Sequence, residues 1–363
     1  MKIFENEQYL EDVRDTAGLE LPWEKLQDRS VLISGATGLA GSFLTDVLLE
    51  RNKTYSMNCR IYALGRRKDK ALKRFAHCGE DPFFRFISHD IREPLICTEI
   101  KSMDYVLHLA SNTHPIAYAK DPIGTITTNI IGLKHMLDFA AGHHARRVVF
   151  ASSNEVYGEN RGDTELFREE DCGYINCNTL RAGYPESKRC GEALCQAYME
   201  QKELDVVIPR LTRSYGPTMQ PDDSKAVSQF IKKGVCGEDV VLKSAGEQYY
   251  SYTYVSDAVS GLLTVLLRGE RGKAYNIADE ASDIRLKDLA ALIAEAAHVR
   301  VIAAPPDETE KKGYSAATRA RLDGRELKTL GWSARYDIKS GIKRTLTILR
   351  SLECADAAND VYR

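Results

Sequence analysis

The sequence contains no long apolar run, which limits the classes of protein to consider. None of its hydrophobic stretches approaches the roughly 20 residues that are needed to cross a bilayer. Its first residues, MKIFENEQYLEDVRD, are too acidic and too interrupted for a signal peptide. We therefore expect a cytoplasmic protein that has no membrane partner.

An excess of charge of either sign is also missing. The 50 Lys and Arg residues nearly balance the 52 Asp and Glu residues, so the formal net charge is -2. Such a chain has no overall field that would attract nucleic acid. A small-molecule substrate fits this composition better.

The cysteines do not have the pattern of a disulfide framework or of a metal site. There are nine of them, an odd number, and they are scattered along the chain. The pairs Cys172 with Cys177 and Cys190 with Cys195 do not have the two-residue spacing of common metal sites, and no histidine lies near them in the sequence. We expect small buried side chains and no bound metal.

What the sequence does contain is a regular alternation of short apolar runs and amphipathic segments. The apolar runs suit strands that are buried on both faces, and they lie at residues 31–34, 60–64, 84–88, 105–109, 147–151, 206–211 and 274–277. Helical spacing of apolar residues is clearest at residues 39–50, 125–142, 185–202 and 283–297. The alternation predicts an α/β fold, with a Rossmann-type doubly wound parallel sheet and a smaller mixed C-terminal substrate lobe.

We expect three parts along the chain. Residues 1–28 form an N-terminal arm with one helix, and residues 29–215 form the dinucleotide-binding domain. After that the pattern loosens, so residues 216–363 are expected to form mainly the substrate-binding lobe, although a strand near 274–278 returns to the first domain. In this lobe Asp257 is expected to cap the helix that follows it.

A glycine-rich loop separates the first predicted strand from the first long helix, in VLISGATGLAGSFLTDVLLE. Gly35 permits a tight turn, Gly38 lets the backbone approach a pyrophosphate, and Gly41 lets the helix pack on its strand. The helix N-terminus favours the anion. With Thr37 and Leu39 between them, these residues predict a dinucleotide site.

Further cofactor contacts are expected at the ends of the next strands. Arg66 and Arg67 follow the second strand, where an NAD site usually offers an acid to the adenosine ribose, so they suit the 2′-phosphate of NADP. A solvated basic loop explains them equally well, which leaves NAD and NADP both open. The other expected contacts are Asp90 and Ile91 near the adenine, Leu109, Ala110 and Ser111 near the nicotinamide, and Asn129 in the following helix.

Two segments carry candidate reactive groups. In YPESK, Pro185 fits the first turn of a helix and sets Tyr184 and Lys188 one turn apart. A nearby ammonium group is expected to lower the pKa of the tyrosine, which would make it a usable acid or base at neutral pH. ASSNEVYG, directly after the 147–151 strand, adds Ser153 and Glu155 to this set.

Taken together, these motifs resemble the extended short-chain dehydrogenases/reductases, in particular the nucleotide-sugar epimerases and dehydratases. The resemblance runs from about residue 26 to about residue 346 and includes GATGLAG, with its three-residue glycine spacing, HDIRE, LHLAS, ASSNEVYG, YPESK and YYSYTYVSDAVSGLL. It implies a sheet of strand order 3-2-1-4-5-6-7, a nucleotide-sugar-like substrate and a homodimer formed through helices of the Rossmann core. It also implies that hydride leaves a sugar carbon, usually C4, while Ser153 binds the hydroxyl, Tyr184 removes its proton and Lys188 tunes Tyr184.

Glu155 distinguishes subfamilies within this resemblance. Simple 4-epimerases need no acid there, whereas GDP-mannose 4,6-dehydratases and UDP-glucuronate decarboxylases carry one. As a general base at C5, Glu155 would favour a dehydratase or a decarboxylase that works through a transient 4-keto sugar. The other possibility is that Glu155 only forms a local cap or salt bridge.

Four residues are expected to contact the substrate: Thr113, Asn154, Arg213 and Tyr250. The last three depart from the family pattern. Asn154 stands where dTDP-glucose 4,6-dehydratases have the Asp that protonates the leaving hydroxyl, and an amide cannot do this. Arg213 replaces a usual Asn, and Tyr250 replaces the Arg that pairs with the diphosphate. Either the positive charge has moved from one wall of the pocket to another, or the substrate is not an ordinary nucleotide sugar.

Two alternative functions stay open. One is a nucleotide-sugar 4-epimerase or an NADPH-dependent reductase of a keto-sugar, which has no need of Glu155. The other is a non-catalytic, dinucleotide-sensing protein, which has no need of the Ser, Tyr and Lys set.

Overall fold

A parallel sheet forms the centre of the molecule. The computed structural model describes residues 2–306, 308, 312 and 317–361. The strands of the sheet run in the order β11-β7-β5-β4-β1-β2-β3, and a short β6 pairs with β7. The family resemblance implied this strand order, and the order is confirmed. The strands are β1 (Ser30–Ser34), β2 (Arg60–Gly65), β3 (Phe84–Ser88), β4 (Tyr105–His108), β5 (Arg147–Phe150), β6 (Ser152–Ser153), β7 (Val206–Leu211) and β11 (Ala274–Ile277).

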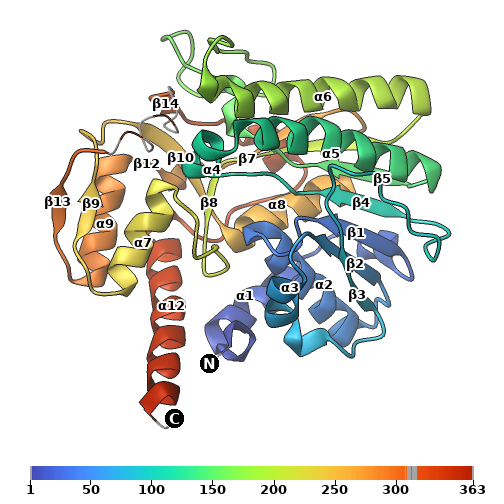
Figure 1. Ribbon diagram of the computed structural model, residues 1–363, viewed down its shortest axis with the longest axis horizontal. Helices are drawn as coiled ribbons and strands as arrows, with labels where there is room; N and C mark the ends of the chain where they lie inside the picture. The colour runs from blue at the N-terminus through green and yellow to red at the C-terminus, as the bar shows by residue number, and fades with distance from the viewer. Residues whose placement is uncertain (1, 307, 309–311, 313–316, 362–363) are drawn as a thin grey trace.

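Helices cover both faces of this sheet (Figure 1). Neighbouring residues of β1 point to opposite faces, so Val31 and Ile33 join one buried cluster and Leu32 joins another. The first cluster includes residues of α1, α2 and α8, and the second includes residues of α5 and α6. The helices are α1 (Glu7–Ala17), α2 (Leu39–Tyr55), α3 (Lys68–Arg74), α4 (Pro115–Lys120), α5 (Pro122–Gly142), α6 (Gly183–Lys202) and α8 (Val255–Arg268).

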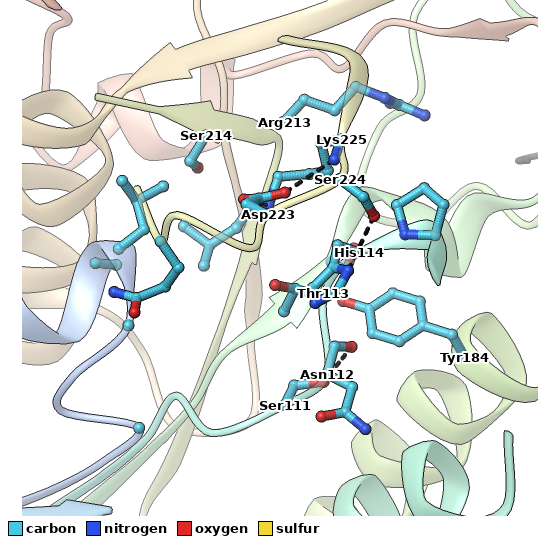
Figure 2. Close-up of a pocket in the computed structure, with 18 of the residues that line it drawn as sticks. Ser111, Asn112, Thr113, His114, Tyr184, Arg213, Ser214, Asp223, Ser224 and Lys225 are labelled. Atoms are coloured by element: carbon cyan, nitrogen blue, oxygen red, sulfur yellow. Dashed lines mark hydrogen bonds and ion pairs between the residues drawn. The ribbon is translucent and has the colours of Figure 1, made fainter. Parts of the chain in front are cut away.

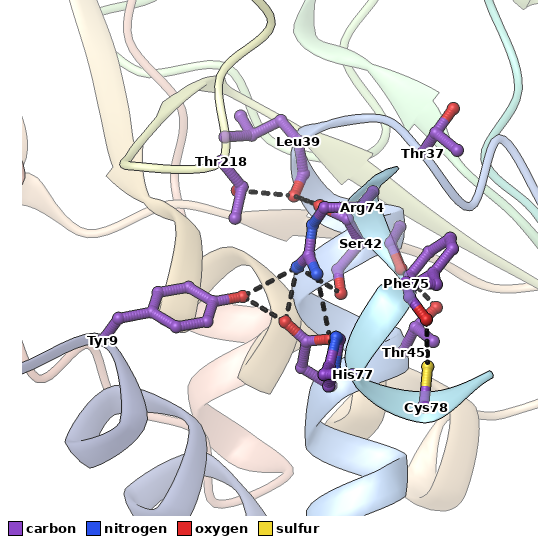
Figure 3. Close-up of polar contacts among 12 residues, drawn as sticks. Tyr9, Thr37, Leu39, Ser42, Thr45, Arg74, Phe75, His77, Cys78 and Thr218 are labelled. Carbon is purple, nitrogen blue, oxygen red and sulfur yellow. Dashed lines mark hydrogen bonds and ion pairs between the residues drawn. The ribbon is translucent and has the colours of Figure 1, made fainter. Parts of the chain in front are cut away.

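The N-terminal arm contains the expected helix, α1, which packs against α2 and α8. The Tyr9 hydroxyl of α1 donates to the Asp46 carboxylate of α2, and Arg74 at the end of α3 pairs with the same carboxylate (Figure 3). Arg74 also donates to the Ser42 carbonyl oxygen over 3.2 Å. The network therefore ties the arm and α3 to the helix that follows the glycine loop.

A smaller lobe follows β7 and contains two further sheets. One comprises β8 (Arg213–Tyr215), β10 (Tyr249–Tyr254), β12 (Asp283–Arg285) and β14 (Arg319–Ala320), and the other pairs β9 (Val240–Leu242) with β13 (Val301–Ala303). Its helices are α7 (Ala226–Val235), α9 (Leu286–Ala297), α11 (Arg325–Thr329) and α12 (Ile338–Val361). The boundaries proposed at residues 28 and 215 stay a prediction. None of the described helices is both long and apolar enough to span a bilayer.

The expected role of Asp257 as a helix cap is wrong. The N-cap of α8 is Tyr254, and no side chain caps this helix. The Asp257 carboxylate instead accepts hydrogen bonds from the backbone N–H groups of Arg335 and Tyr336, over 2.9 and 3.0 Å. Asp257 thus ties α8 to the segment before α12, and burial raises its pKa to about 7.

Candidate active site

One cavity of about 870 Å³ runs from the glycine loop, past the carboxyl ends of the sheet strands, to the smaller lobe. Ligands of open parallel sheets bind at this edge, where the strand order reverses between β1 and β4. The cavity is lined by all but one of the predicted cofactor-binding, substrate-binding and reactive residues: Gly35, Thr37, Gly38, Leu39, Gly41, Arg66, Arg67, Asp90, Ile91, Leu109, Ala110, Ser111, Thr113, Ser153, Asn154, Glu155, Tyr184, Lys188, Arg213 and Tyr250.

The exception is Asn129, which is fully buried behind the cavity. Its amide oxygen accepts a hydrogen bond from the Ser111 hydroxyl over 2.6 Å, and its amide nitrogen donates to Ser187 over 2.8 Å. Asn129 therefore holds the loop after β4 against α6 and does not itself line the cavity.

The glycine loop fits the pyrophosphate of a dinucleotide. Gly35 has a φ of 73°, and a Cβ there would lie 2.8 Å from the backbone of Ala110. A Cβ on Gly41 would lie 2.3 Å from the Gly35 carbonyl oxygen. Gly38 is the N-cap of α2, and no side-chain hydrogen bond caps this helix end. The first N–H groups of α2 are thus available to an anion.

Tyr184 has a higher pKa than the sequence suggested. Burial raises its pKa to about 12, and the charge of Glu155 acts in the same direction. Hydrogen bonds with the hydroxyls of Ser153 and Ser111 lower the pKa, as does the charge of Arg181. The Tyr184 ring stacks on Tyr118 of α4 at a centroid distance of 4.7 Å. The phenol is therefore held in place from several sides.

Lys188 contacts the backbone of the reactive segment, ASSNEVYG (residues 151–158). Its ammonium group donates to the Ala151 carbonyl oxygen over 2.8 Å and lies 4.9 Å from the centroid of the Phe150 ring. Burial lowers its pKa to about 8, against the opposing charge of Glu192. The expected lowering of the Tyr184 pKa by Lys188 is not seen, because burial dominates and the strongest charges near the phenol are those of Glu155 and Arg181.

The Glu155 carboxylate lies between two guanidinium groups. Arg181 Nη2 is 2.7 Å from one of its oxygens, and Arg213 Nη2 is 3.4 Å from the other. All three side chains are about 15% exposed. The sequence missed Arg181, which lies in a 3-10 turn (Leu180–Ala182) directly before α6. Its signal was its position three residues before Tyr184.

Arg213 also stacks on Tyr250, another residue that departs from the family pattern. The centre of its guanidinium group lies 3.4 Å from the centroid of the Tyr250 ring. The two residues come from paired strands, since β8 runs parallel to β10 with Arg213 opposite Tyr252. Tyr250 of β10 carries no positive charge, and Arg213 of the neighbouring strand β8 supplies one at the same place.

A second polar cluster lines the same cavity and was not found from the sequence (Figure 2). His114 Nδ1 lies 3.0 Å from the Ser224 hydroxyl, and Lys225 Nζ lies 2.6 Å from the Asp223 carboxylate. Asp223, Ser224 and Lys225 belong to the loop between β8 and α7. His114 joins this loop to the one that follows β4.

Comparison with known proteins identifies the family. Residues 31–278 match the NAD dependent epimerase/dehydratase family. The chain belongs to this family. It is therefore an enzyme that uses NAD, one of the two dinucleotides that the glycine loop left open, and it acts on a small-molecule substrate.

Members of the epimerase/dehydratase family with known activity are similar over most of the chain. UDP-glucuronic acid decarboxylase 5 of Arabidopsis thaliana is 32% identical over 316 residues, which is 86% of each protein. UDP-glucuronic acid decarboxylase 1 of Xenopus tropicalis is 30% identical over 338 residues, covering 92% of this chain and 75% of the relative.

Solved structures of the same fold include two sugar-nucleotide enzymes. The dTDP-glucose 4,6-dehydratase DesIV of Streptomyces venezuelae, solved with NAD bound, superposes with a TM-score of 0.77 at 24% identity, over 90% of this chain and 98% of its own. The UDP-glucuronic acid 4-epimerase of Bacillus cereus, solved with UDP-glucuronic acid and NAD, gives a TM-score of 0.76 at 20% identity, over 89% and 99%. These likenesses confirm the α/β fold.

The described part of this family member holds no group of three or more His, Cys, Asp or Glu side chains that could bind a metal ion. Cys172 and Cys177 are free and exposed, and in the other pair Cys190 is exposed while Cys195 is buried. The sequence had suggested small buried side chains, and this is wrong for three of these four cysteines.

Proposed function

We propose that this enzyme decarboxylates a nucleotide-activated uronic acid through a 4-keto intermediate. One observation carries the proposal: the reactive segment offers no acid to a leaving hydroxyl. Asn154 is a buried amide, and Glu155 is ion-paired to Arg181 and Arg213. Dehydration must protonate the hydroxyl as it leaves, whereas carbon dioxide leaves without a proton.

The residues of the chain support each step of this reaction. Bound NAD supplies the acceptor and, later, the donor of the hydride at C4. Tyr184 takes the proton from the C4 hydroxyl, which the Ser153 hydroxyl hydrogen-bonds. The resulting ketone is β to the C6 carboxylate, so the electrons of the C5–C6 bond pass into the carbonyl group as carbon dioxide leaves. The Tyr184 phenol stabilises the enolate by donating a hydrogen bond, and C5 then takes up a proton from water. When the C4 ketone is reduced again, Tyr184 returns its proton to the C4 oxygen.

Arg213 supports a substrate that has an anionic group in this part of the cavity. Its Nη1 is buried and, among the described residues, has no hydrogen-bond partner. Buried donors of this kind are costly unless a ligand satisfies them. An anionic group of the substrate, either its carboxylate or its diphosphate, would provide the missing acceptor.

The test is an incubation of the full-length protein and NAD with UDP-glucuronate, and separately with UDP-glucose and GDP-mannose, with products detected by mass. We expect loss of carbon dioxide from UDP-glucuronate and no loss of water from the neutral sugars. Loss of water, or only isobaric products, would overturn the proposal and leave a dehydratase or a 4-epimerase. Net consumption of added NADPH would indicate the reductase instead, and no turnover of any sugar would favour the sensing protein.

We further propose that the protein forms a homodimer through α5 and α6, which lie side by side on one face of the sheet (Figure 1). Large apolar side chains are exposed here: Ile123 is 75% exposed, and Ile126, Ile131 and Leu180 are 38 to 50% exposed. Exposed apolar clusters on helices favour association. Light scattering during gel filtration should give a dimer mass, and Ile123→Asp with Ile126→Asp should give a monomer.

A further inference from the structure

A nearly buried ion pair lies behind the reactive segment. Arg210 of β7 donates two hydrogen bonds to the Glu192 carboxylate of α6, from Nε to Oε1 over 2.9 Å and from Nη2 to Oε2 over 2.7 Å. The Arg210 and Glu192 side chains are only 11% and 16% exposed, and neither residue lines the cavity. A bidentate pair of this kind has a fixed geometry, so it can hold other groups in place without touching a ligand.

The ion pair contacts the reactive segment near both of its ends. At one end the Ser152 hydroxyl donates to Glu192 Oε1 over 2.5 Å, and Ser152 stands opposite Arg210 where β6 pairs with β7. At the other end Arg210 Nη1 donates to the Tyr157 hydroxyl over 2.8 Å. These two attachment points enclose residues 153–156, which include the candidate reactive groups of the segment.

Successive turns of α6 contact the same segment. Tyr184 hydrogen-bonds the Ser153 hydroxyl, and Lys188, one turn later, donates to the Ala151 carbonyl oxygen over 2.8 Å. Glu192 follows one further turn along the helix. A shift of the segment against α6 would therefore change the contacts of all three helix residues together.

Glu192 also acts on the charge of Lys188. Burial lowers the pKa of Lys188 to about 8, and the charge of Glu192 is the largest influence in the opposite direction. Cys195 of the same helix acts in the same direction as Glu192, but burial raises the pKa of this thiol and favours its neutral form. His108 of β4 interacts electrostatically with Lys188, and burial lowers the pKa of its ring to about 3, which favours the uncharged ring. The negative charge of Glu192 thus favours the ammonium form of Lys188.

We propose that the Glu192–Arg210 ion pair positions the reactive segment and the Lys188 ammonium group for catalysis, although neither member of the pair lines the cavity. Through its contacts with the segment, the pair holds the Ser153 hydroxyl beside the Tyr184 phenol. A displacement of about 1 Å at such a contact can lower a rate by roughly 10²-fold. The inference does not depend on decarboxylation, because any reaction that oxidises a substrate hydroxyl in this cavity would use the same contact.

Steady-state assays of variants test the positioning of the segment. The full-length protein is assayed with NAD and whichever of UDP-glucuronate, UDP-glucose and GDP-mannose the wild type converts. Ser152→Ala leaves the ion pair intact but detaches the segment from it, so kcat should fall about 10- to 100-fold while KM stays within about 2-fold. Arg210→Lys keeps the positive charge but loses the bidentate geometry, and it should lower kcat in the same way.

The pH dependence of kcat separates the charge of Glu192 from its hydrogen bonds. The ammonium form of Lys188 is lost as the pH rises through its pKa of about 8, so the alkaline limb of the wild-type profile should lie there. Glu192→Gln removes the negative charge and should move this limb to lower pH. Glu192→Asp keeps the charge on a shorter side chain, so it should restore the limb but not kcat. Ser152→Ala should leave the limb in place.

A titration without substrate makes the test independent of the proposed reaction. NMR of the NAD-bound full-length protein, isotope-labelled at lysine Cε, follows Lys188, whose signal is the one that Lys188→Met removes. The titration midpoint of this signal should be lower by about 1 pH unit or more in Glu192→Gln. Glu200→Gln is the matched control, because it removes an exposed carboxylate of the same helix, and it should leave the midpoint unchanged.

Three results would overturn the proposal. They are an unchanged NMR midpoint in Glu192→Gln, a wild-type kcat in Ser152→Ala, and a loss of activity in Ser152→Ala that is matched by weaker NAD binding and a lower unfolding temperature. The last result would show a merely structural role. A wild-type protein that converts none of the three sugars would refute the proposed decarboxylation, and the NMR midpoint would then decide the present inference.

Discussion

Replacing Arg213 by Asn, the usual residue of the family at this position, tests how the cavity recognises its substrate. The fold should tolerate the change, because Glu155 keeps its closer pairing with Arg181, over 2.7 Å. What is lost is the buried Nη1 donor, which has no partner among the described residues. A hydrogen bond to a charged group is worth about 1.5–3 kcal/mol, which corresponds to roughly 10- to 160-fold in affinity.

We therefore expect KM for UDP-glucuronate to rise about 10- to 160-fold, with a smaller change in kcat, because the contact is made in the ground state as well as in the transition state. The assay follows carbon dioxide release, and calorimetry with UDP locates the contact. If Arg213 binds the diphosphate, UDP affinity falls by the same factor. If it binds the carboxylate, UDP affinity is unchanged and only the preference for the uronate over UDP-glucose is lost.

The double variant Arg213→Asn with Tyr250→Arg returns the positive charge to β10, the position usual in the family. Because the two side chains stack in the same part of the cavity, the double variant should recover most of the lost affinity. Arg300→Asn, which removes an arginine with a side chain that is 83% exposed, is the control and should change nothing. An unaltered KM in Arg213→Asn, with thermal unfolding also unchanged, would refute the assignment of Arg213 to the substrate.

Three further predictions follow from the same geometry. Tyr184→Phe removes the proton acceptor and should lower kcat by about 10² to 10⁴ while dinucleotide binding by calorimetry stays intact; full activity would favour the sensing protein. Tyr118→Leu removes a stacking contact worth about 0.5–1.5 kcal/mol, so kcat should fall about 2- to 13-fold and the pH profile should shift, whereas Tyr118→Phe should restore both. Burial raises the pKa of Asp257 to about 7 from an ordinary value near 3.8, so its protonated form stabilises the fold fully below pH 4 and this contribution is lost as the pH rises through 7. The free energy of unfolding from urea titrations should fall over that range, and Asp257→Asn should flatten the dependence; an unchanged slope in the variant would contradict the assignment.

The sequence by itself determined the elements that depend on local patterns. Each buried strand and the glycine loop are encoded within a few consecutive residues, and the spacing of Gly35, Gly38 and Gly41 leaves few backbone solutions. Tyr184 and Lys188 are one helical turn apart, so their proximity follows from helix geometry alone. Nearly all the predicted contacts lie in a single cavity, because parallel strands bring their carboxyl ends to one edge of the sheet.

Only the tertiary structure decided how the charges in that cavity are arranged. Arg181 and Arg213 are 26 and 58 residues from Glu155, and no periodicity relates positions on separate elements. The raised pKa of Tyr184 likewise depends on burial by chain segments that are remote in sequence, which outweighed the expected effect of Lys188. Asp257 looked like a helix cap locally, but its partners come from residues 335 and 336. Local sequence fixes which groups are present and which element carries them, whereas the packing of distant segments fixes their partners and their proton affinities.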